Sequence, residues 1–415
     1  MKTLKYIISA AVIASTMALA SCSDVVDYEV PDKFQSNGTP VITAIYDVQD
    51  TQHTNTLNGG VLNQMLRIVG HNLSNVKRVT FNGLEVDTRS IYAEADSAFL
   101  KIPRKIPEEV TNKLVYTTEQ GTTELDFTVD IPNMRLEGLR NEFAKQGTSV
   151  QVSGEYFDLF GFNDFTETSP ATITINNTAA GYSETIHADS ISEEYMSIEI
   201  PEDCPDNSLI TFTWQEMGQP KTKSIPYRMT DQLMFGDFDG DVGWWNDWGK
   251  TLVTDGTKEG DPESLGYNYL RINGTFDIWS WNSTGLGCNW RWADAITNPQ
   301  NYVLKFEVNT NSSKPFCNYG WNAKDQKATG GYYFSFEGAD GHRYQWDPVT
   351  DGLTNTYGKW VTVSVPLNEC LNSEKMPVFD EFYPLEIVVQ PNSQDDSAWN
   401  IDHSFGQFRI EPKEY

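Results

Sequence analysis

The chain has 415 residues, enough for two to three domains, and its 58 Asp and Glu residues against 30 Lys and Arg residues give a formal net charge of −28. A surface this negative repels the phosphate backbone of nucleic acids, and it disfavours anionic lipid surfaces and polyanionic glycans as main ligands. The composition therefore predicts a neutral ligand and no nucleic acid partner.

The first 21 residues have the features of a bacterial lipoprotein signal peptide. Lys2 and Lys5 precede an apolar stretch, residues 6–20, that is too short to span a bilayer as a mature helix. The tetrapeptide Leu-Ala-Ser-Cys that ends at Cys22 resembles a lipobox, and the acidic residues after it resemble the surface-export signals of Bacteroidetes lipoproteins. We therefore expect lipidation at Cys22, a membrane partner through that anchor, and localisation at the outer membrane, on the cell surface.

Residues 22–39 are polar and contain proline and glycine, which predicts a tether. After them the chain has no long helical periodicity. It consists of short runs of alternating apolar and polar residues, separated by Gly, Asn, Asp and Pro. This pattern predicts an all-β fold for the whole mature chain.

A weak internal repeat divides the first half of the body into two units. Residues 67–73 are similar in sequence to residues 151–157, and two further pairs of similar segments follow in the same order in both units. The units, residues 40–131 and 132–230, have the size of immunoglobulin-like β-sandwiches. The Gly-His-Asn-Leu and Phe-Asn-Gly segments of the first unit resemble the IPT/TIG type of this domain. We expect both units to act as spacers.

Residues 231–415 read as a third, larger β domain. The pattern predicts a first strand and turn at 233–240, and further strands at 302–309, 331–337, 342–346, 359–367, 385–390 and 407–411. Eight or more antiparallel strands in a domain of this length indicate a jelly-roll β-sandwich. The order of these strands resembles that of galactose-binding-like carbohydrate-binding modules.

Eleven of the twelve tryptophans lie after residue 230, which is more than a core needs. Indole has a flat apolar face and one N–H donor, so it suits a pyranose ring, which is apolar on its faces and polar at its rim. This enrichment predicts an aromatic platform that stacks on sugars. We expect the glycan-binding residues to be Trp290, Trp292, Trp321, Trp346, Tyr319 and Arg343.

The platform hypothesis depends on the direction in which aromatic pairs face. Residues i and i+2 of a strand share a face, so Trp279 with Trp281 and Tyr344 with Trp346 are each expected to form a pair. The alternative is that some pairs point into the core. Trp360, flanked by alternating valines, and Trp399, just before the last strand, are expected to be structural.

Metal, cofactor and disulfide signals are weak. The acidic segment that begins at Asp237 resembles the opening of an EF-hand loop, but Trp248 stands where the bidentate Glu belongs. An acidic turn is therefore favoured over a structural calcium held with Asp402, and we expect neither metal nor cofactor. Four cysteines allow three pairings, which the sequence leaves open: Cys204, Cys288, Cys317 and Cys370.

No motif indicates catalysis. The Gly-x-Ser-x-Gly elbow and the His-Glu-x-x-His motif are both missing from the sequence. A glycosidase needs two carboxylates at a fixed separation, and no local motif marks such a pair. We therefore expect no catalytic residues.

Lipobox, two immunoglobulin-like units and an aromatic-rich terminal sandwich together resemble the B-type surface glycan-binding proteins of Bacteroidetes polysaccharide-utilisation loci, which end in a xyloglucan-binding-type domain. Residues 302–309 and 358–363 carry the most specific part of this resemblance. It implies a non-catalytic protein that captures a neutral polysaccharide, often a β-glucan such as xyloglucan, and supports its uptake beside a TonB-dependent transporter complex. A surface glycoside hydrolase and a protein-binding adhesin remain as alternatives.

Overall fold

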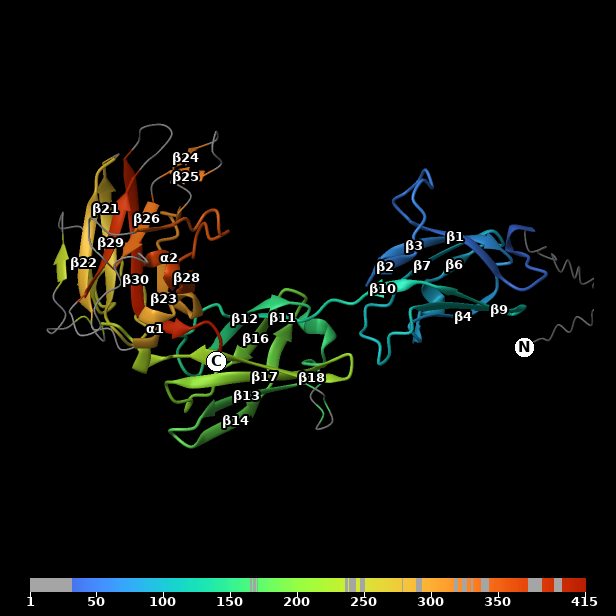
Figure 1. The fold of residues 1–415 in the computed structure, drawn as a ribbon, viewed down its shortest axis with the longest axis horizontal. Coiled ribbons are helices and arrows are strands. Elements are labelled where there is room, and N and C mark those ends of the chain that lie inside the picture. Colours follow the sequence, from blue (N-terminus) through green and yellow to red (C-terminus); the bar gives the residue numbers. More distant parts are fainter. Residues whose placement is uncertain are drawn as a thin grey trace, which may run out of the picture. The chain divides into compact units, whose positions relative to one another are not determined.

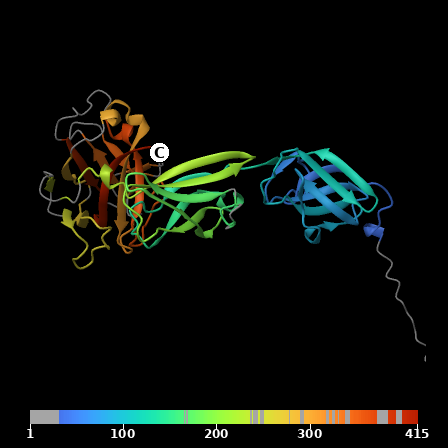
Figure 2. The ribbon, with the colours of Figure 1, turned by 90° about the horizontal axis from the view of Figure 1, so that it is seen from below.

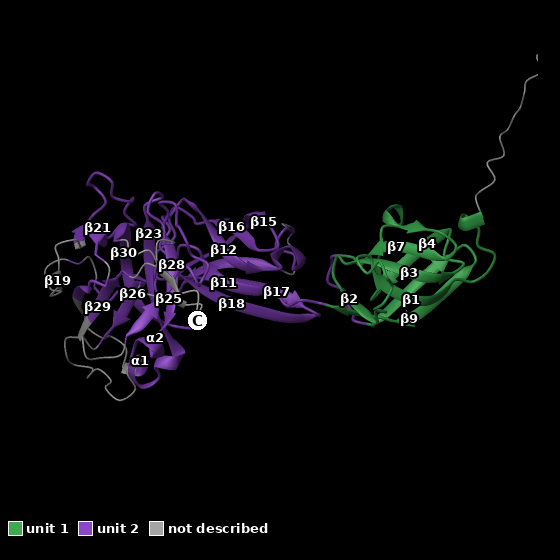
Figure 3. Cartoon of the chain, turned by 90° about the horizontal axis from the view of Figure 1, so that it is seen from above, with its two compact units in different colours: residues 1–103, 111–130 green, residues 104–110, 131–415 purple. Residues whose placement is uncertain are grey.

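The computed structural model describes residues 32–164, 166, 169, 171–235, 238, 244–246, 251–277, 279–288, 293–316, 320–322, 327–329, 331–336, 343–371, 383–391 and 398–415. The expected signal peptide and Cys22 lie outside these residues. No helix in the described part of the chain has the length and apolarity needed to cross a membrane. The chain forms two compact units, one of residues up to 103 with 111–130 and one of residues 104–110 with 131–415 (Figure 3).

The first unit is an immunoglobulin-like sandwich of two four-stranded sheets. One sheet has the order β1 (Val41–Asp47), β3 (Met65–His71), β7 (Ser97–Lys101) and β6 (Tyr92–Ala93). The other has the order β5 (Leu84–Glu85), β4 (Val76–Phe81), β8 (Lys113–Thr118) and β9 (Gly121–Asp126). A short parallel pair, β2 (Gly59–Val61) and β10 (Thr128–Asp130), adds to them. Alternate residues of these strands, such as Leu66, Ile68 and Leu100, form the core.

The second unit begins with a sandwich of the same design. Its sheets have the orders β11 (Arg135–Leu139), β12 (Ser149–Glu155), β16 (Tyr195–Glu199), β15 (Ala188–Ile191), and β14 (Tyr182–Ile186), β13 (Thr172–Asn177), β17 (Ser208–Glu216), β18 (Gln219–Tyr227). Strand for strand, this order repeats that of the first unit. The internal repeat predicted from the sequence is therefore confirmed.

Gly70 and Gly154 explain why the repeat survives in the sequence. Each lies in the second strand of its sandwich and faces a bulge in the first strand, where the pairing register shifts. A β-carbon at Gly70 would collide with the carbonyl oxygen of Val41, and one at Gly154 with that of Arg135. Only glycine permits this close backbone approach at both positions.

Gly154→Ala is expected to lower the free energy of unfolding by about 2 kcal/mol, because the added methyl must displace a strand backbone. Gly138→Ala is the matched control: its β-carbon would meet only Glu142 Oε1 at 3.8 Å. Thermal unfolding of the two variants beside wild type measures the difference. Equal melting temperatures for the two variants would contradict the close approach at Gly154.

The C-terminal part of the second unit is a sandwich of two five-stranded sheets (Figures 1 and 2). The β22 sheet has the order β19 (Trp244–Asn246), β22 (Asn282–Cys288), β29 (Tyr383–Gln390), β26 (Gly331–Ser335), β27 (Tyr344–Trp346). The β30 sheet has the order β20 (Thr251–Thr254), β21 (Tyr269–Phe276), β30 (Trp399–Pro412), β23 (Tyr302–Thr310), β28 (Val361–Pro366). The two inner faces meet in one large aromatic core. The all-β fold with immunoglobulin-like and terminal sandwiches is thus confirmed.

Short elements complete the chain. β24 (Gly320–Asn322) pairs with β25 (Lys327–Thr329), and the α-helices are α1 (Ala293–Thr297) and α2 (Leu367–Cys370). The 3-10 helices are η1 (Asp32–Phe34), η2 (Thr88–Ser90), η3 (Phe157–Leu159), η4 (Thr230–Gln232) and η5 (Pro299–Asn301).

Most strands predicted in the C-terminal domain are present, with one exception. The expected first strand at 233–240 is wrong over residues 233–235, where Leu233 makes only an isolated bridge to Arg409. Residues 236, 237, 239 and 240 lie outside the described chain. β30 is far longer than the predicted 407–411, and β22 was missed because Asn-Ser-Thr-Gly-Leu-Gly-Cys has no apolar alternation.

His403 joins the two sheets inside the core. Its Nε2 lies 2.8 Å from the carbonyl oxygen of Lys314, which can only accept, so Nε2 carries the proton. Its Nδ1 then accepts from the hydroxyl of Tyr332, also at 2.8 Å. Burial lowers the pKa of His403 to about 4, because the core disfavours the imidazolium.

This burial predicts a loss of stability in acid. Above pH 6.5 the ring is neutral in both the folded and the unfolded chain. As the pH falls towards 4, only the unfolded chain takes up the proton, so folding loses about 3 kcal/mol in total. His403→Gln keeps a donor and an acceptor without this titration. Unfolding measured between pH 7.5 and 4 should show the wild type losing its advantage over the variant, whereas a constant difference would contradict a neutral buried His403.

Candidate functional site

The outer face of the β30 sheet is occupied by the chain itself. Arg409, on β30, is fully buried and its guanidinium binds three carboxylates: Nη2 lies 2.6 Å from Glu142, Nη1 2.8 Å from Glu307 and Nε 2.6 Å from Glu411. Lys305 on β23 donates to Glu142 at 2.7 Å and to Glu411 at 3.0 Å. Glu142 comes from the second immunoglobulin-like sandwich, so this network joins the two sandwiches of the second unit.

Three carboxylates face two cations in this network, and their pKa values diverge. Burial raises the pKa of Glu307 to about 7, against the opposing pull of Arg409. For Glu411 burial acts in the same direction, but Arg409 and Lys305 outweigh it and lower its pKa. The network is therefore close to neutral when Glu307 holds a proton.

Apolar contacts also hold together the joint between the second immunoglobulin-like sandwich and the C-terminal sandwich. Trp360 packs edge-to-face on Tyr269 with ring centroids 5.0 Å apart, and its indole N–H donates to the carbonyl oxygen of Glu263 at 2.6 Å. Phe143, from the immunoglobulin-like side, belongs to the same cluster. The prediction that Trp360 is structural is confirmed, but it packs at the joint between sandwiches and not between the two sheets.

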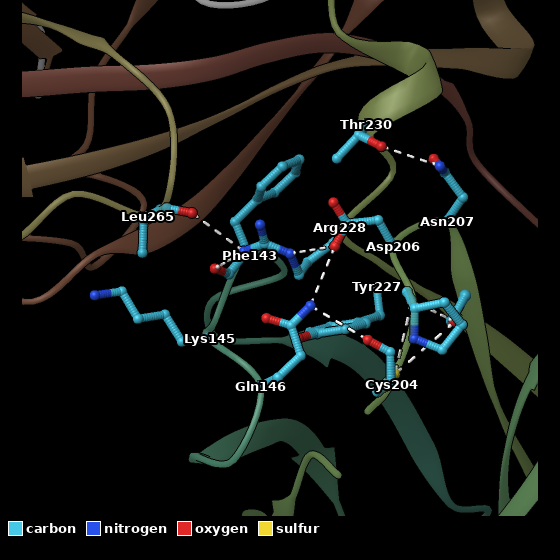
Figure 4. Close-up of polar contacts among 12 residues, drawn as sticks. Phe143, Lys145, Gln146, Cys204, Asp206, Asn207, Tyr227, Arg228, Thr230 and Leu265 are labelled. Atoms are coloured by element: carbon cyan, nitrogen blue, oxygen red, sulfur yellow. Dashed lines mark hydrogen bonds and ion pairs between the residues drawn. The ribbon is translucent and has the colours of Figure 1, made fainter. Parts of the chain in front are cut away.

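Arg228 adds a polar clamp to the joint (Figure 4). Its Nε donates to Asp206 at 2.6 Å, and Nη1 donates to the carbonyl oxygens of Phe143 at 3.0 Å and Leu265 at 3.2 Å. A cleft of 580 Å³ lies beside these contacts, with Arg140, Lys359 and Trp360 in its lining.

The other end of the same face carries a buried ion pair at Asp402, the carboxylate named above as the alternative ligand of a structural calcium. Arg271 donates to both oxygens of Asp402, at 2.7 and 2.9 Å, and to Asp261 at 2.8 Å. Although burial opposes it, Arg271 lowers the pKa of Asp402. The guanidinium thus supplies the positive charge that this carboxylate needs. No group of metal-ligating residues occurs in the described part of the chain, and the acidic segment from Asp237 to Asp241 falls largely outside it.

The outer face of the β22 sheet carries an aromatic and basic cluster. Trp281 lies just before β22, and its ring is 5.9 Å from that of Tyr333 on β26, tilted by 34°. The guanidinium of Arg343 stands 4.6 Å from the Trp281 ring centre, within cation–π range. All three side chains are partly exposed. Burial raises the pKa of Tyr333, so its phenol is neutral and able to donate at physiological pH.

Glu386, on the central strand β29, belongs to the same outer face. It pairs with Gly285 of β22 on one side and with Ser335 of β26 on the other. Its Oε1 accepts from the hydroxyl of Ser283 at 2.6 Å. The aromatic rings and the guanidinium on this sheet face can stack on a sugar and bind its hydroxyls, whereas Glu386 is only 5% exposed.

The structure places the predicted site residues in different environments. Arg343 lies on this outer face. Trp346 is only 1% exposed and packs in the core against Phe306 and Phe316, so the prediction that it stacks on a sugar is wrong. It does share a strand face with Tyr344, but this face points inward.

Other predicted residues lie beyond what the structure describes. Trp290, Trp292 and Tyr319 are outside the described residues, and of Trp321 only the backbone, in β24, is described. Their role in binding stays a prediction.

Trp279 and Trp281 do not form the expected strand pair. Trp279 has a positive φ of 60° and lies in the turn before β22, where the residue is 62% exposed. Trp399 is 1% exposed, as expected for a structural residue. Tyr333 and Glu386 were not anticipated. The period-2 rule offers a signal for Tyr333, since its neighbours Tyr332 and Phe334 must then face the core.

Two of the cysteines whose side chains the structure describes are free. Cys204 and Cys370 are both buried without a disulfide partner, which excludes every pairing that involves them. Burial raises the pKa of the Cys204 thiol to about 11 and also raises that of Cys370, so both are inert thiols. Bonding between Cys288 and Cys317 lies outside the described side chains.

One family model matches the C-terminal domain. Residues 227–412 match the family model of the surface glycan-binding protein B xyloglucan binding domain. The resemblance of this domain to B-type surface glycan-binding proteins is thereby confirmed. Among curated proteins, none matches the chain.

Two solved structures are similar over most of the chain. The surface glycan-binding protein PbSGBP-B from Prevotella bryantii is 21% identical, with 92% of this chain and 100% of that chain covered and a TM-score of 0.47. SGBP-B from a complex xyloglucan utilization locus in Bacteroides uniformis is 19% identical, with 90% and 99% covered and a TM-score of 0.48.

Proposed function

We propose that the protein is a non-catalytic cell-surface lipoprotein that binds a neutral polysaccharide, a β-glucan such as xyloglucan, on the outer face of the β22 sheet. The family match of residues 227–412 carries the proposal, because the domain family is named for xyloglucan binding. The net charge of −28 supports a neutral ligand.

The contacts at the joint support the placement of the site. A β-sandwich has two outer faces, and the second immunoglobulin-like sandwich and the Arg271 ion pair already occupy much of the outer face of the β30 sheet. The β22 sheet offers Trp281, Tyr333 and Arg343 instead. Trp290, Trp292 and Trp321 extend this platform in the proposal.

The remaining parts of the proposal concern the cell surface. Lipidation at Cys22 anchors the protein to the outer membrane, and the immunoglobulin-like sandwiches act as spacers between the anchor and the binding domain. Captured polysaccharide passes to a neighbouring TonB-dependent transporter complex. A weak site on an anchored protein gains avidity along a long polymer.

Affinity electrophoresis of the purified chain in gels that contain neutral or acidic polysaccharides tests the binding. Xyloglucan or another neutral β-glucan should retard the protein, and acidic polysaccharides should not. Release of oligosaccharide products would instead indicate a glycoside hydrolase. Cell binding that free oligosaccharide does not compete away would indicate an adhesin.

A further inference from the structure

Four cross-strand neighbours form an aromatic and cationic row on the outer face of the first immunoglobulin-like sandwich. The row crosses the sheet of β1, β3, β7 and β6 (Figure 1). Tyr46 pairs with Arg67, and Arg67 pairs with Phe99. Phe99 in turn pairs with Tyr92, so the four side chains lie side by side. Because neighbouring strands are about 4.8 Å apart, this outer row is about 14 Å long.

Contacts between rings and cations hold the outer row together, and its surface is open to solvent. The Phe99 ring centre lies 6.2 Å from that of Tyr92, and the guanidinium carbon of Arg67 lies 5.6 Å from the Phe99 ring centre. Arg67 also donates to the Nε2 atom of His53. Tyr92 is 50% exposed, and the other three residues of the row are partly exposed. A ligand can therefore reach all four.

The second immunoglobulin-like sandwich shows that the fold does not require this row. It repeats the strand order of the first sandwich, and the sequence repeat aligns Arg67 with Gln151. The cross-strand partner of Gln151 is Ser197, and that of Ser197 is Ser190. Where the first sandwich presents Arg, Phe and Tyr, the second thus presents Gln, Ser and Ser. The rings of the outer row are not part of the core, so their presence at the surface indicates a binding role.

The chemistry of the outer row is that of the glycan site proposed on the β22 sheet. Both surfaces combine two neighbouring rings with a guanidinium that stands over one of them. Rings stack on the apolar faces of sugars, and guanidinium N–H groups donate to sugar hydroxyls. The net charge of −28 disfavours a polyanionic ligand on either surface.

We propose that the outer row is a second contact for the same neutral polysaccharide, in which sugar rings stack on Phe99 and Tyr92 while Arg67 donates to their hydroxyls. This inference rests on the proposed function, and it gives the first sandwich a binding role in addition to that of a spacer. Two linked contacts bind a long polymer more tightly than either contact does alone. The outer row therefore strengthens binding of polysaccharide and leaves the affinity of the C-terminal site for a short oligosaccharide unchanged.

Affinity electrophoresis of the full chain in xyloglucan gels, together with calorimetric titration of a xyloglucan oligosaccharide, tests the proposal. The double variant Tyr92→Ser with Phe99→Ser introduces the residues that the second sandwich has at these positions. We expect its affinity for the polymer to fall at least roughly tenfold, because one of two linked contacts is lost. Its oligosaccharide affinity at the C-terminal site should equal that of wild type. Tyr195→Ser, at a 44% exposed position in β16, is the matched control and should bind the polymer as wild type does.

Hydroxyl-radical footprinting of the wild type with xyloglucan polymer gives a second readout, which decides the question if the double variant does not fold. Tyr92 and Phe99 should become protected by the polymer. Unchanged polymer affinity in a folded double variant would overturn the proposal, and so would Tyr92 and Phe99 that stay unprotected in the wild type. A wild-type dimer that the double variant abolishes in sedimentation would overturn it too, and would make the outer row an interface between copies of this chain.

The same measurements separate this inference from the proposed function. If the wild type binds no neutral polysaccharide, the proposed function fails and the inference fails with it. If the wild type binds the polymer while the outer row is neither required nor protected, the second contact alone fails.

Discussion

Arg409→Met is expected to destabilise the second unit by about 3–5 kcal/mol, the cost of breaking a buried ion network by removing one partner. Arg409 is fully buried and bonds Glu142, Glu307 and Glu411. Without it, Lys305 is left with three carboxylates, and at least two of them must be neutralised or hydrated. The joint between the two sandwiches should therefore loosen together with the fold of β30.

Thermal and urea unfolding of the full chain measure this effect. Arg135→Met is the matched control, because Arg135 is exposed and its pairs with Glu137 and Glu155 lie at the surface. Surface pairs contribute at most about 1 kcal/mol, so the control should melt close to the wild type. If Arg409→Met and Arg135→Met have the same melting temperature, the network does not hold the two sandwiches together.

The second large effect is expected at Trp281. Trp281→Ala should weaken binding of a neutral β-glucan roughly tenfold or more, because one stacked sugar face is lost and burial of that area is worth about 1–2 kcal/mol. The variant also removes the ring beneath the Arg343 guanidinium. Trp281→Phe keeps an aromatic face and should restore part of the affinity.

Tyr357→Ala controls for the loss of an exposed aromatic residue. Tyr357 is 69% exposed and adjoins Gly358, which lines the cleft at the joint between the sandwiches. Titration calorimetry with the same oligosaccharide should give wild-type affinity for this variant. Wild-type affinity for Trp281→Ala, or a loss equal to it in Tyr357→Ala, would contradict the placement of the site on the β22 sheet.

The sequence predicts the fold class well because the signals involved are local. The alternation of apolar and polar residues within each strand, and the turn residues between strands, identify the β domains. The repeat is readable because Gly70 and Gly154 each face a carbonyl oxygen that excludes any side chain. Such constraints depend only on neighbouring strands of one small sandwich.

The site is less predictable, because the direction of a strand face is a tertiary property. The period of two correctly places Tyr344 and Trp346 on one face but does not say which face is buried. In β26 the run Tyr332-Tyr333-Phe334 is aromatic on both faces, so composition does not separate core from platform. β22 has little apolar alternation, which hides its position beside Trp281.

The burial of charged residues in β30 could not be predicted from the sequence either. Arg409 and Glu411 read as a solvent-facing pair in a strand, yet both are fully buried. Their burial depends on Glu142, which lies 267 residues away in the sequence, in another sandwich. A pattern within one strand carries no information about such a contact.

Hydroxyl-radical footprinting of the full chain, with and without a xyloglucan oligosaccharide, tests most directly whether glycan lies on the outer face of the β22 sheet. Trp281 and Tyr333 should become protected when the oligosaccharide binds, while Tyr357 and the residues around Trp360 keep their reactivity. Protection confined to the cleft at the joint between the sandwiches, with Trp281 and Tyr333 unchanged, would contradict the account.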